Sequence, residues 1–190
     1  MPNLYIISGC NGAGKTTASF TILPEMLNCY EFINADEIAK GLSPLNPDKS
    51  AIEAGRIMLS KIDKLIHEKA DFAFETTLAT RSYVKYIEKA KVLGYKVTLL
   101  YFWLDSIQLA IERVKIRVLE GGHNIPDDVI ERRYYAGVKN FFQLYCPVSD
   151  YWLLLNNSQS PSDLIAEGYS NQEIDILNTE VYTKIKSLVK

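Results

Sequence analysis

Five short apolar runs alternate with longer stretches of helical period along this chain of 190 residues. The runs lie at residues 4–8, 30–34, 71–75, 95–104 and 151–156. They are too continuously apolar for strands with one face in water, so each is expected to be buried on both faces. Alternation of such strands with helices predicts an α/β fold, a parallel sheet with helices on both faces.

The other long segments complete this prediction. Residues 47–69 are predicted to form one amphipathic helix. Its expected apolar stripe consists of Ile52, Ile57, Leu59, Ile62, Leu65 and Ile66. Residues 163–177 are expected to form a hairpin that turns at Ser170 and Asn171, and residues 178–190 a closing helix. Because no repeat or low-complexity linker divides the chain, residues 1–190 are expected to form a single domain.

Composition narrows the class of protein. Hydrophobic residues make up 47% of the chain and the formal net charge is -2, which suits a domain with its own core and no bulk attraction to nucleic acid. The N-terminal residues lack a basic leader, and no apolar run approaches the length of a membrane span. Cys10, Cys29 and Cys146 contain no C-x-x-C pair, so reduced structural thiols are expected. We therefore expect a cytoplasmic protein with neither a nucleic-acid nor a membrane partner.

A glycine-rich stretch, GCNGAGKTT at residues 9–17, follows the first expected strand and precedes a helix. It satisfies G-x-x-x-x-G-K-[ST], the phosphate-binding loop of P-loop NTPases. Glycines let backbone N–H groups approach phosphates, and the helix N-terminus adds the positive end of its dipole. The alternative is a glycine-rich turn that holds no ligand.

The P-loop motif also predicts the role of each residue. Lys15, as an exposed loop side chain, is expected to reach the β- and γ-phosphates of ATP, and Thr16 to bind Mg²⁺. The expected nucleotide-binding residues of the loop are Gly9, Asn11, Gly12, Ala13, Gly14, Lys15, Thr16 and Thr17.

The classes of protein that share a P-loop can be told apart by their other motifs, and two such motifs are missing from this sequence. No N-K-x-D-like motif for reading guanine follows the fourth or fifth strand, and no second glycine-rich signature suggests a transport ATPase. A small-molecule or nucleotide kinase therefore remains. This class needs a base for the acceptor hydroxyl, an acceptor-binding region and a cationic lid.

Two acidic residues follow neighbouring strands at the carboxyl edge of the sheet, where ligands of open parallel sheets bind. Asp36 comes after the second strand and is the expected catalytic base. Its alternative role is the N-cap of a helix that begins near Glu37. Glu75 ends the third run and is expected to hold the substrate or a metal-bound water, unless it is a chemically inert strand terminus.

A segment at residues 117–133 is expected to be a lid after the fourth strand. Gly121 and Gly122 provide flexible backbone, and a second helix is expected to begin beside Pro126 and Asp127. The arginines around it are Arg113, Arg117, Arg132 and Arg133. Guanidinium groups on both arms of such a loop can clamp the phosphates of ATP, and we expect Arg117 and Arg132 to act in catalysis.

Other readings of the basic residues stay open. The lid helices could instead form a solvated surface in which arginines pair with Glu112, Glu120 and Glu131. His123 could contact phosphate or fill a turn. Arg56 and Arg81 lie before and after the third strand and are expected to border the acceptor, gripping its phosphate if the acceptor is anionic.

These motifs together resemble those of the zeta-toxin family of P-loop kinases, in its short bacterial branch. The resemblance rests on GCNGAGKTT, FINADEIAKGLSP, FAFETTLATRSY, RVLEGGHNIPDDVIERRYYAGVKNFFQLY and YWLLLNNS, and it extends from the first strand through the fifth. It implies a five-stranded parallel sheet in the order 2-3-1-4-5, with a lid after strand 4, followed by the C-terminal hairpin and helix.

The resemblance also implies an activity. Lys15 and Thr16 match the family's ATP and metal residues, Asp36 matches the aspartate that activates a sugar hydroxyl, and the lid arginines match residues that hold the phosphates. The better studied members phosphorylate UDP-N-acetylglucosamine and so block cell-wall synthesis. The expected function is therefore ATP- and Mg²⁺-dependent transfer of the γ-phosphate to a hydroxyl of a nucleotide-sugar or another small metabolite. The alternatives are a non-catalytic ATP-binding switch and a toxin–antitoxin component regulated by an antitoxin protein.

Overall fold

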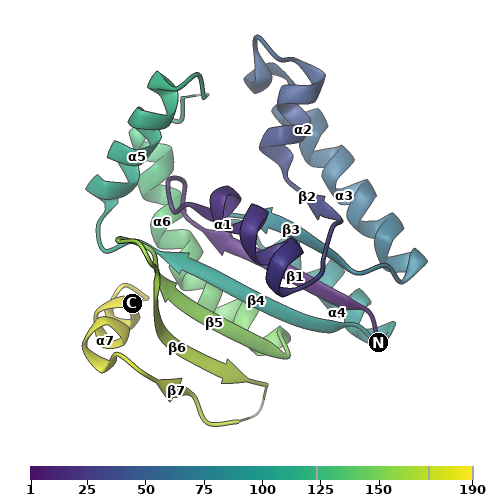
Figure 1. Cartoon of the computed structure of the whole chain (residues 1–190), viewed down its shortest axis with the longest axis vertical. Coiled ribbons are helices and arrows are strands. Elements are labelled where there is room, and N and C mark those ends of the chain that lie inside the picture. The colour runs from purple at the N-terminus through teal and green to yellow at the C-terminus, as the bar shows by residue number, and fades with distance from the viewer. Residues whose placement is uncertain (123, 171, 190) are drawn as a thin grey trace.

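The computed structural model of the protein describes residues 1–122, 124–170 and 172–189. Within these residues, seven strands form one sheet in the order β2-β3-β1-β4-β5-β6-β7 (Figure 1). The strands are β1 (Asn3–Gly9), β2 (Phe32–Ile33), β3 (Phe72–Thr76), β4 (Lys96–Trp103), β5 (Tyr151–Asn156), β6 (Asp163–Tyr169) and β7 (Asp175–Ile176). Strands β1 to β5 pair in parallel in the predicted order 2-3-1-4-5, which confirms that part of the prediction.

The C-terminal hairpin belongs to the sheet, so the prediction of five strands was wrong in number. β6 pairs with β5 in an antiparallel direction, and β7 pairs with β6 in the same way. A short connection is enough to join antiparallel strands, so the chain can add them directly to the outer side of β5. The hairpin itself is confirmed, although Asn171 of the predicted turn lies outside the described residues.

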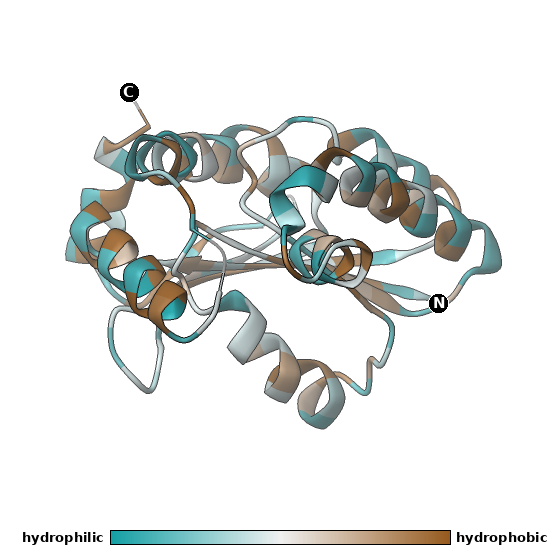
Figure 2. Ribbon diagram, turned by 90° about the horizontal axis from the view of Figure 1, so that it is seen from above, coloured by the Kyte–Doolittle hydropathy of each residue, from teal (hydrophilic) through white to brown (hydrophobic). Residues whose placement is uncertain are grey.

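Helices cover both faces of the sheet, as predicted. Figure 2 shows the largely hydrophobic strands between helices whose colours alternate between brown and teal. The helices are α1 (Lys15–Thr21), α2 (Ala35–Leu42), α3 (Ala51–Glu68), α4 (Val84–Val92), α5 (Ile107–Leu119), α6 (Asp127–Asn140) and α7 (Thr179–Ser187). Short π-helical turns are η1 (Ile22–Met26) and η3 (Phe141–Tyr145), and 3₁₀ turns are η2 (Pro47–Ser50) and η4 (Cys146–Val148). The predicted closing helix corresponds to α7, and none of the described helices is both long and apolar enough to cross a membrane.

The long helix before β3 differs from its prediction at its start and on its buried face. Residues 47–50 form a 3₁₀ turn, and α3 begins only at Ala51. The buried residues of α3 are Ala54, Met58, Ile62, Leu65 and Ile66. Ile52 is 75% exposed and Ile57 is 38% exposed, so these two do not belong to the apolar stripe. The prediction considered only large aliphatic residues. It therefore omitted Ala54 and Met58, which lie on the buried face of α3.

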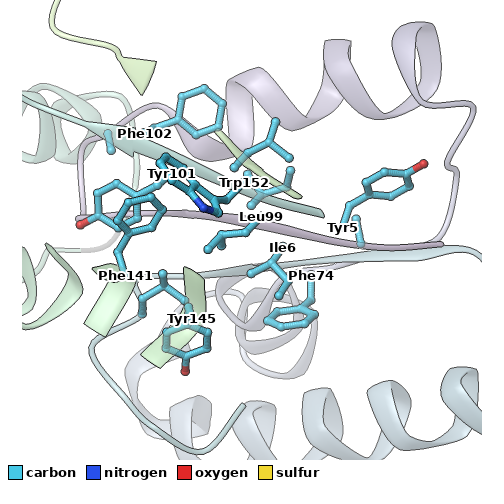
Figure 3. Packing of buried hydrophobic residues seen from close by; sticks show 14 of the residues in the cluster. Tyr5, Ile6, Phe74, Leu99, Tyr101, Phe102, Phe141, Tyr145 and Trp152 are labelled. Atoms are coloured by element: carbon cyan, nitrogen blue, oxygen red, sulfur yellow. The ribbon is translucent and has the colours of Figure 1, made fainter. Parts of the chain in front are cut away.

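The buried hydrophobic residues form one connected cluster that extends from β1 to α7. Aromatic rings fill its centre, where Phe141 lies 4.8 Å from Tyr101 and 5.6 Å from Trp152 between ring centroids (Figure 3). Offset and edge-to-face aromatic pairs of this kind add about 0.5–1.5 kcal/mol beyond the area that they bury. This packing holds β5 against β4, and β4 pairs with β1, whose carboxyl end leads into the glycine-rich loop.

Candidate active site

The glycine-rich loop leaves β1 at Gly9 and enters α1 at Lys15. Gly9 and Gly14 have φ angles of 143° and 76°, in the region that favours glycine. A Cβ atom on Gly9 would lie 2.2 Å from the carbonyl oxygen of Phe102, and one on Gly14 would lie 2.6 Å from Nδ2 of Asn157. The loop therefore requires glycine at position 9, because the backbone of β4 approaches it closely. At position 14 the positive φ angle favours glycine, since the neighbouring atom belongs to a side chain that could move.

Lys15 is buried, with 6% of its surface exposed, so the expectation of an exposed loop lysine was wrong. Its Nζ donates to the carbonyl oxygen of Cys10 at 2.9 Å and lies 3.6 Å from Oε1 of Glu75. The ammonium group thus lies against the glycine-rich loop, because it bonds a loop carbonyl oxygen and pairs with a carboxylate at the end of β3. Burial raises the pKa of the Cys10 thiol to about 11, although the charge of Lys15 acts in the opposite direction.

Glu75, at the carboxyl end of β3, connects the loop to the neighbouring strand. Its Oε2 accepts from Oγ1 of Thr16 at 2.7 Å and from Nδ2 of Asn34 at 2.9 Å. The Glu75 side chain is only 10% exposed, so these donors satisfy a carboxylate that water hardly reaches. Glu75 therefore lies beside Lys15 and Thr16, as the strand-end rule predicted.

Asp36 lies in the first turn of α2 and does not cap it. The cap is Asn34, whose Oδ1 accepts from the backbone N–H of Asp36 at 2.8 Å and of Glu37 at 3.3 Å. The alternative reading of Asp36 as the N-cap was therefore wrong, because α2 begins two residues earlier than the sequence suggested. The Asp36 carboxylate is left available to line the cavities beside the loop.

Arg133, on α6, reaches the same region from the other side. Its Nη1 donates to Oδ1 of Asn11 in the loop at 3.1 Å. Burial lowers the pKa of the Arg133 guanidinium, and the charge of Asp36 opposes this shift. Since an arginine keeps its proton throughout the ordinary pH range, a cation and a carboxylate face each other near the loop.

Three adjoining cavities surround these groups, and Asp36 lines all three. The inner cavity, of about 190 Å³, lies beyond Lys15 and is bordered by Asp36, Glu75, Thr77 and Arg133. The loop cavity, of about 240 Å³, is lined by the glycine-rich loop together with Arg113 and Arg117. The lid cavity, of about 290 Å³, lies between α2 and the end of α5. Figure 1 shows α5 and the α2–α3 pair on opposite sides of α1.

The four arginines of the predicted lid occupy different places. Arg117 lines the loop and lid cavities, and Arg133 lines the inner cavity. Arg113 lines the loop cavity, where its Nη1 and Nη2 donate to the carbonyl oxygens of Asn157 and Ser158 at 2.8 and 2.9 Å. Arg132 is exposed and lines none of the three cavities. The new helix does begin at Asp127, directly after Pro126, while His123 lies outside the described residues.

Arg56 and Arg81 are both exposed, and neither lines any of the three cavities. Thr80, directly before Arg81, and Tyr83, two residues after it, do line the inner cavity. Thr17 lines the loop cavity. The predicted roles of Arg56 and Arg81 in acceptor binding stay predictions.

Two asparagines at this site were not predicted from the sequence. Asn34 directly precedes the second helix, where a residue that prefers N-caps was a usable signal. Asn157 follows β5, and its Nδ2 donates to the carbonyl oxygen of Ala13 at 2.7 Å, so the loop after β5 supports the glycine-rich loop. The strand-end rule that found Asp36 and Glu75 applies to Asn157 as well.

The groups near Thr16 fit a magnesium ion. The Thr16 hydroxyl and the Glu75 carboxylate lie 2.7 Å apart, and both are the hard oxygen ligands that Mg²⁺ prefers. In the part of the chain that the structure describes, no group of three or more His, Cys, Asp and Glu side chains could hold a metal by itself. Magnesium usually keeps several waters and takes substrate phosphate oxygens as ligands, so a small protein contribution is sufficient.

The sheet order, the glycine-rich loop and the helices on both faces define a P-loop kinase fold. Residues 1–146 match the Zeta toxin family, and the chain therefore belongs to that family, as the motifs indicated. An uncharacterized protein of Haemophilus influenzae is 33% identical over 127 residues, which are 66% of this chain and 88% of that protein.

Solved structures share the fold at low sequence identity. The complex of AvrRxo1-ORF1 and AvrRxo1-ORF2 with sulphate ions contains a chain that matches with a TM-score of 0.78 and 18% identity, covering 99% of this chain and 64% of that one. The PezAT chromosomal toxin–antitoxin system of Streptococcus pneumoniae matches with a TM-score of 0.64 and 16% identity, covering 100% of this chain and 86% of that one. The present chain thus spans less than two thirds of its AvrRxo1 relative, and likeness at these identities concerns the fold.

Proposed function

We propose that the protein is an ATP- and Mg²⁺-dependent phosphotransferase that moves the γ-phosphate to a hydroxyl of a nucleotide-sugar or another small metabolite. One observation carries this proposal: Lys15 of the glycine-rich loop, Asp36 of α2 and Arg133 of α6 line the same inner cavity. A phosphate-binding group, a base and a second cation are what transfer to a hydroxyl requires. The cytoplasmic location expected from the sequence is part of the proposal.

The loop cavity is the proposed site for the phosphates of ATP. Backbone N–H groups of residues 9–17 and the N-terminus of α1 bind the phosphates, and Lys15 exchanges its contact with the Cys10 carbonyl for phosphate oxygens. Thr16 and Glu75 would hold a magnesium ion, which would neutralise charge on the phosphates of ATP. Arg113 and Arg117 border the same cavity and contribute further positive charge, and Arg132 is proposed to join them on lid closure.

The inner cavity is the proposed site for the acceptor hydroxyl. Asp36 takes the proton of this hydroxyl while the hydroxyl oxygen attacks the γ-phosphorus of ATP. The bond between the γ-phosphorus and the oxygen that bridges it to the β-phosphate breaks, and ADP leaves. Lys15 and Arg133 stabilise the charge on the transferring group. Thr76, Thr77 and Thr80 supply side-chain hydroxyls to the cavity, which suit hydrogen bonds to a polyhydroxylated acceptor.

The comparisons support this proposal in two respects. The Zeta toxin family fits a kinase-like activity, and UDP-N-acetylglucosamine, the acceptor implied by the resemblance, is the first acceptor to test. One structure of the AvrRxo1-ORF1 and AvrRxo1-ORF2 complex contains ATP. AvrRxo1-ORF1 was solved together with AvrRxo1-ORF2, and PezAT is a toxin–antitoxin system, so regulation by an antitoxin-like protein is the second candidate function.

The experiment is transfer of label from γ-labelled ATP, with Mg²⁺, to UDP-N-acetylglucosamine and to a bacterial metabolite extract. Label is expected to appear in a new phosphorylated product with the wild-type chain, and to disappear from it with Asp36→Asn. Absence of any labelled product from either acceptor source, with ATP bound normally, would refute the kinase and favour the switch that acts through a protein partner.

A further inference from the structure

The amide of Asn34 contacts three segments of the chain at once. It is 7% exposed and follows β2 directly. Its Oδ1 accepts from the first turn of α2, at the N–H groups of Asp36 and Glu37. Its Nδ2 donates to Glu75 at 2.9 Å and lies 3.4 Å from Oγ1 of Thr16. One planar group thus joins the glycine-rich loop, the end of β3 and the helix that carries Asp36.

The orientation of this amide is determined by its neighbours. Backbone N–H groups lie on one side and can only donate, so they require the amide oxygen. The carboxylate of Glu75 lies on the other side, and an ionised carboxylate can only accept, so it requires the NH₂ group. A flipped amide would place oxygen against the carboxylate and lose contacts on both sides. The arrangement therefore holds Asn34 in one orientation.

A cap alone does not explain this geometry. Asp and Ser cap helices about as well as Asn, and Thr somewhat less well, and each carries an oxygen that can accept from the N–H groups at the start of α2. Among these residues, only Asn also carries an NH₂ group that can donate to a carboxylate at the same time. The NH₂ group of Asn34 is therefore directed to Glu75 beside the glycine-rich loop, and its amide oxygen to α2, the helix that carries the proposed base.

We propose that Asn34 is a positioning residue that fixes Asp36 relative to Thr16 and Glu75, so that the nucleotide side and the acceptor side of the site keep one geometry. This inference rests on the proposed function. It assigns to Asn34 a role in turnover beyond that of a helix cap. Asn34 borders the inner and lid cavities, and in this account it acts through the groups that it bonds.

Two substitutions separate positioning from capping. Asn34→Asp and Asn34→Ser both retain a capping oxygen, but the first replaces the donor by a carboxylate and the second is neutral and too short to bridge. Asn178 offers a matched control, because its Oδ1 caps α7 by accepting from the N–H of Val181 at 3.1 Å and it lines none of the three cavities. Asn178→Asp and Asn178→Ser make the same chemical changes at an exposed cap.

The assay measures kcat and KM for Mg²⁺-ATP as phosphate released to water and as transfer to UDP-N-acetylglucosamine. Both Asn34 variants are expected to lower kcat at least about tenfold with less change in KM, since small displacements of reacting groups cost up to about a hundredfold. The Asn34 variants are also expected to melt at lower temperatures than the Asn178 variants, because each removes a buried donor from Glu75. The value of kcat is therefore compared well below every transition, where the Asn178 variants are expected to keep wild-type kcat. Wild-type kcat in both Asn34 variants would overturn the proposal, and so would a loss confined to the charged variant.

A second measurement uses the unmodified chain. Because Asn34 bonds both the loop side and α2, an inert ATP analogue with Mg²⁺ is expected to slow hydrogen exchange in residues 35–42 as well as in residues 9–17. Protection of the loop without any change in residues 35–42 would overturn the positioning role, even if the variants failed to fold. A wild-type chain that binds ATP but neither releases nor transfers its γ-phosphate would instead refute the proposed function.

Discussion

Replacing Asp36 by Asn tests the proposed base with little change in shape. The substitution removes one negative charge and the ability to accept a proton, while the amide keeps nearly the same volume. Since Asn34 provides the cap of α2, the hydrogen bonds at the start of this helix are expected to survive the change. Affinity for nucleotide is expected to stay within several-fold, because the phosphate-binding groups belong to the loop and to the arginines.

The expected magnitudes differ between activity and stability. A positioned general base contributes about 10² to 10⁴ in rate, which corresponds to about 3–5 kcal/mol of activation barrier. A carboxylate in the first turn of a helix gains only about 0.3–1 kcal/mol from the helix dipole. For a chain of 190 residues, a loss of that size lowers the melting temperature by about 4 °C at most. Activity should therefore fall far more than stability.

The assay follows label transfer from γ-labelled ATP alongside thermal unfolding. Glu53→Gln is the control, because Glu53 is an exposed acid in the first turn of α3 and lines none of the three cavities. The control is expected to keep wild-type transfer with a similar small change in melting temperature. Transfer by Asp36→Asn within threefold of wild type would refute the base assignment, whatever its stability.

Three further predictions concern the cations of the site. Lys15→Ala is expected to weaken Mg²⁺-ATP binding at least about tenfold by calorimetry; unchanged affinity would remove the phosphate-loop assignment. If the acceptor is anionic, Arg56→Ala and Arg81→Ala are expected to raise its KM with less effect on ATP, and equal losses for both ligands would place these arginines elsewhere. Arg117→Ala is expected to slow transfer, and an inert ATP analogue to slow hydrogen exchange across residues 119–128 more than in α7; full activity together with a lid already protected without nucleotide would remove the clamp from the mechanism.

The parallel part of the fold could be predicted because its signals are local. Each of the first five strands is a short apolar run, and the glycine-rich loop fixes where β1 ends and α1 begins. The attachment of β6 to β5 could not be predicted in the same way, since a hairpin sequence does not state which strand it will join. The buried face of α3 was missed at Ala54 and Met58 because small and flexible side chains carry a weaker periodic signal than Ile or Leu.

The site was predictable where residue type and strand position agree. Lys15, Thr16, Asp36 and Glu75 all lie at the carboxyl edge of the sheet beside the loop, as the positions of their strands required. The burial of Lys15 was not predictable, because it depends on contacts across the fold.

Asparagine roles at the site also depend on tertiary contacts. Asn34 and Asn157 lie within two of the motifs that carry the family resemblance, but they carry no charge. Their roles follow from groups more than forty residues away, namely Glu75 for one and Ala13 for the other. The roles of adjacent arginines are equally hard to predict from sequence. Arg133 lines the inner cavity and Arg132 does not, and this depends only on which side of α6 each residue occupies.

Both outermost strands of the sheet, β2 and β7, are only two residues long. A long exposed outer strand is a template on which other chains can add strands and aggregate, and very short ones offer few unpaired groups for this. The longest strand, the eight-residue β4, lies at the centre of the sheet, where both its sides are paired. The hairpin after β5 thus also acts as a cover, since without it the apolar run from Trp152 to Leu155 would be open to intermolecular pairing.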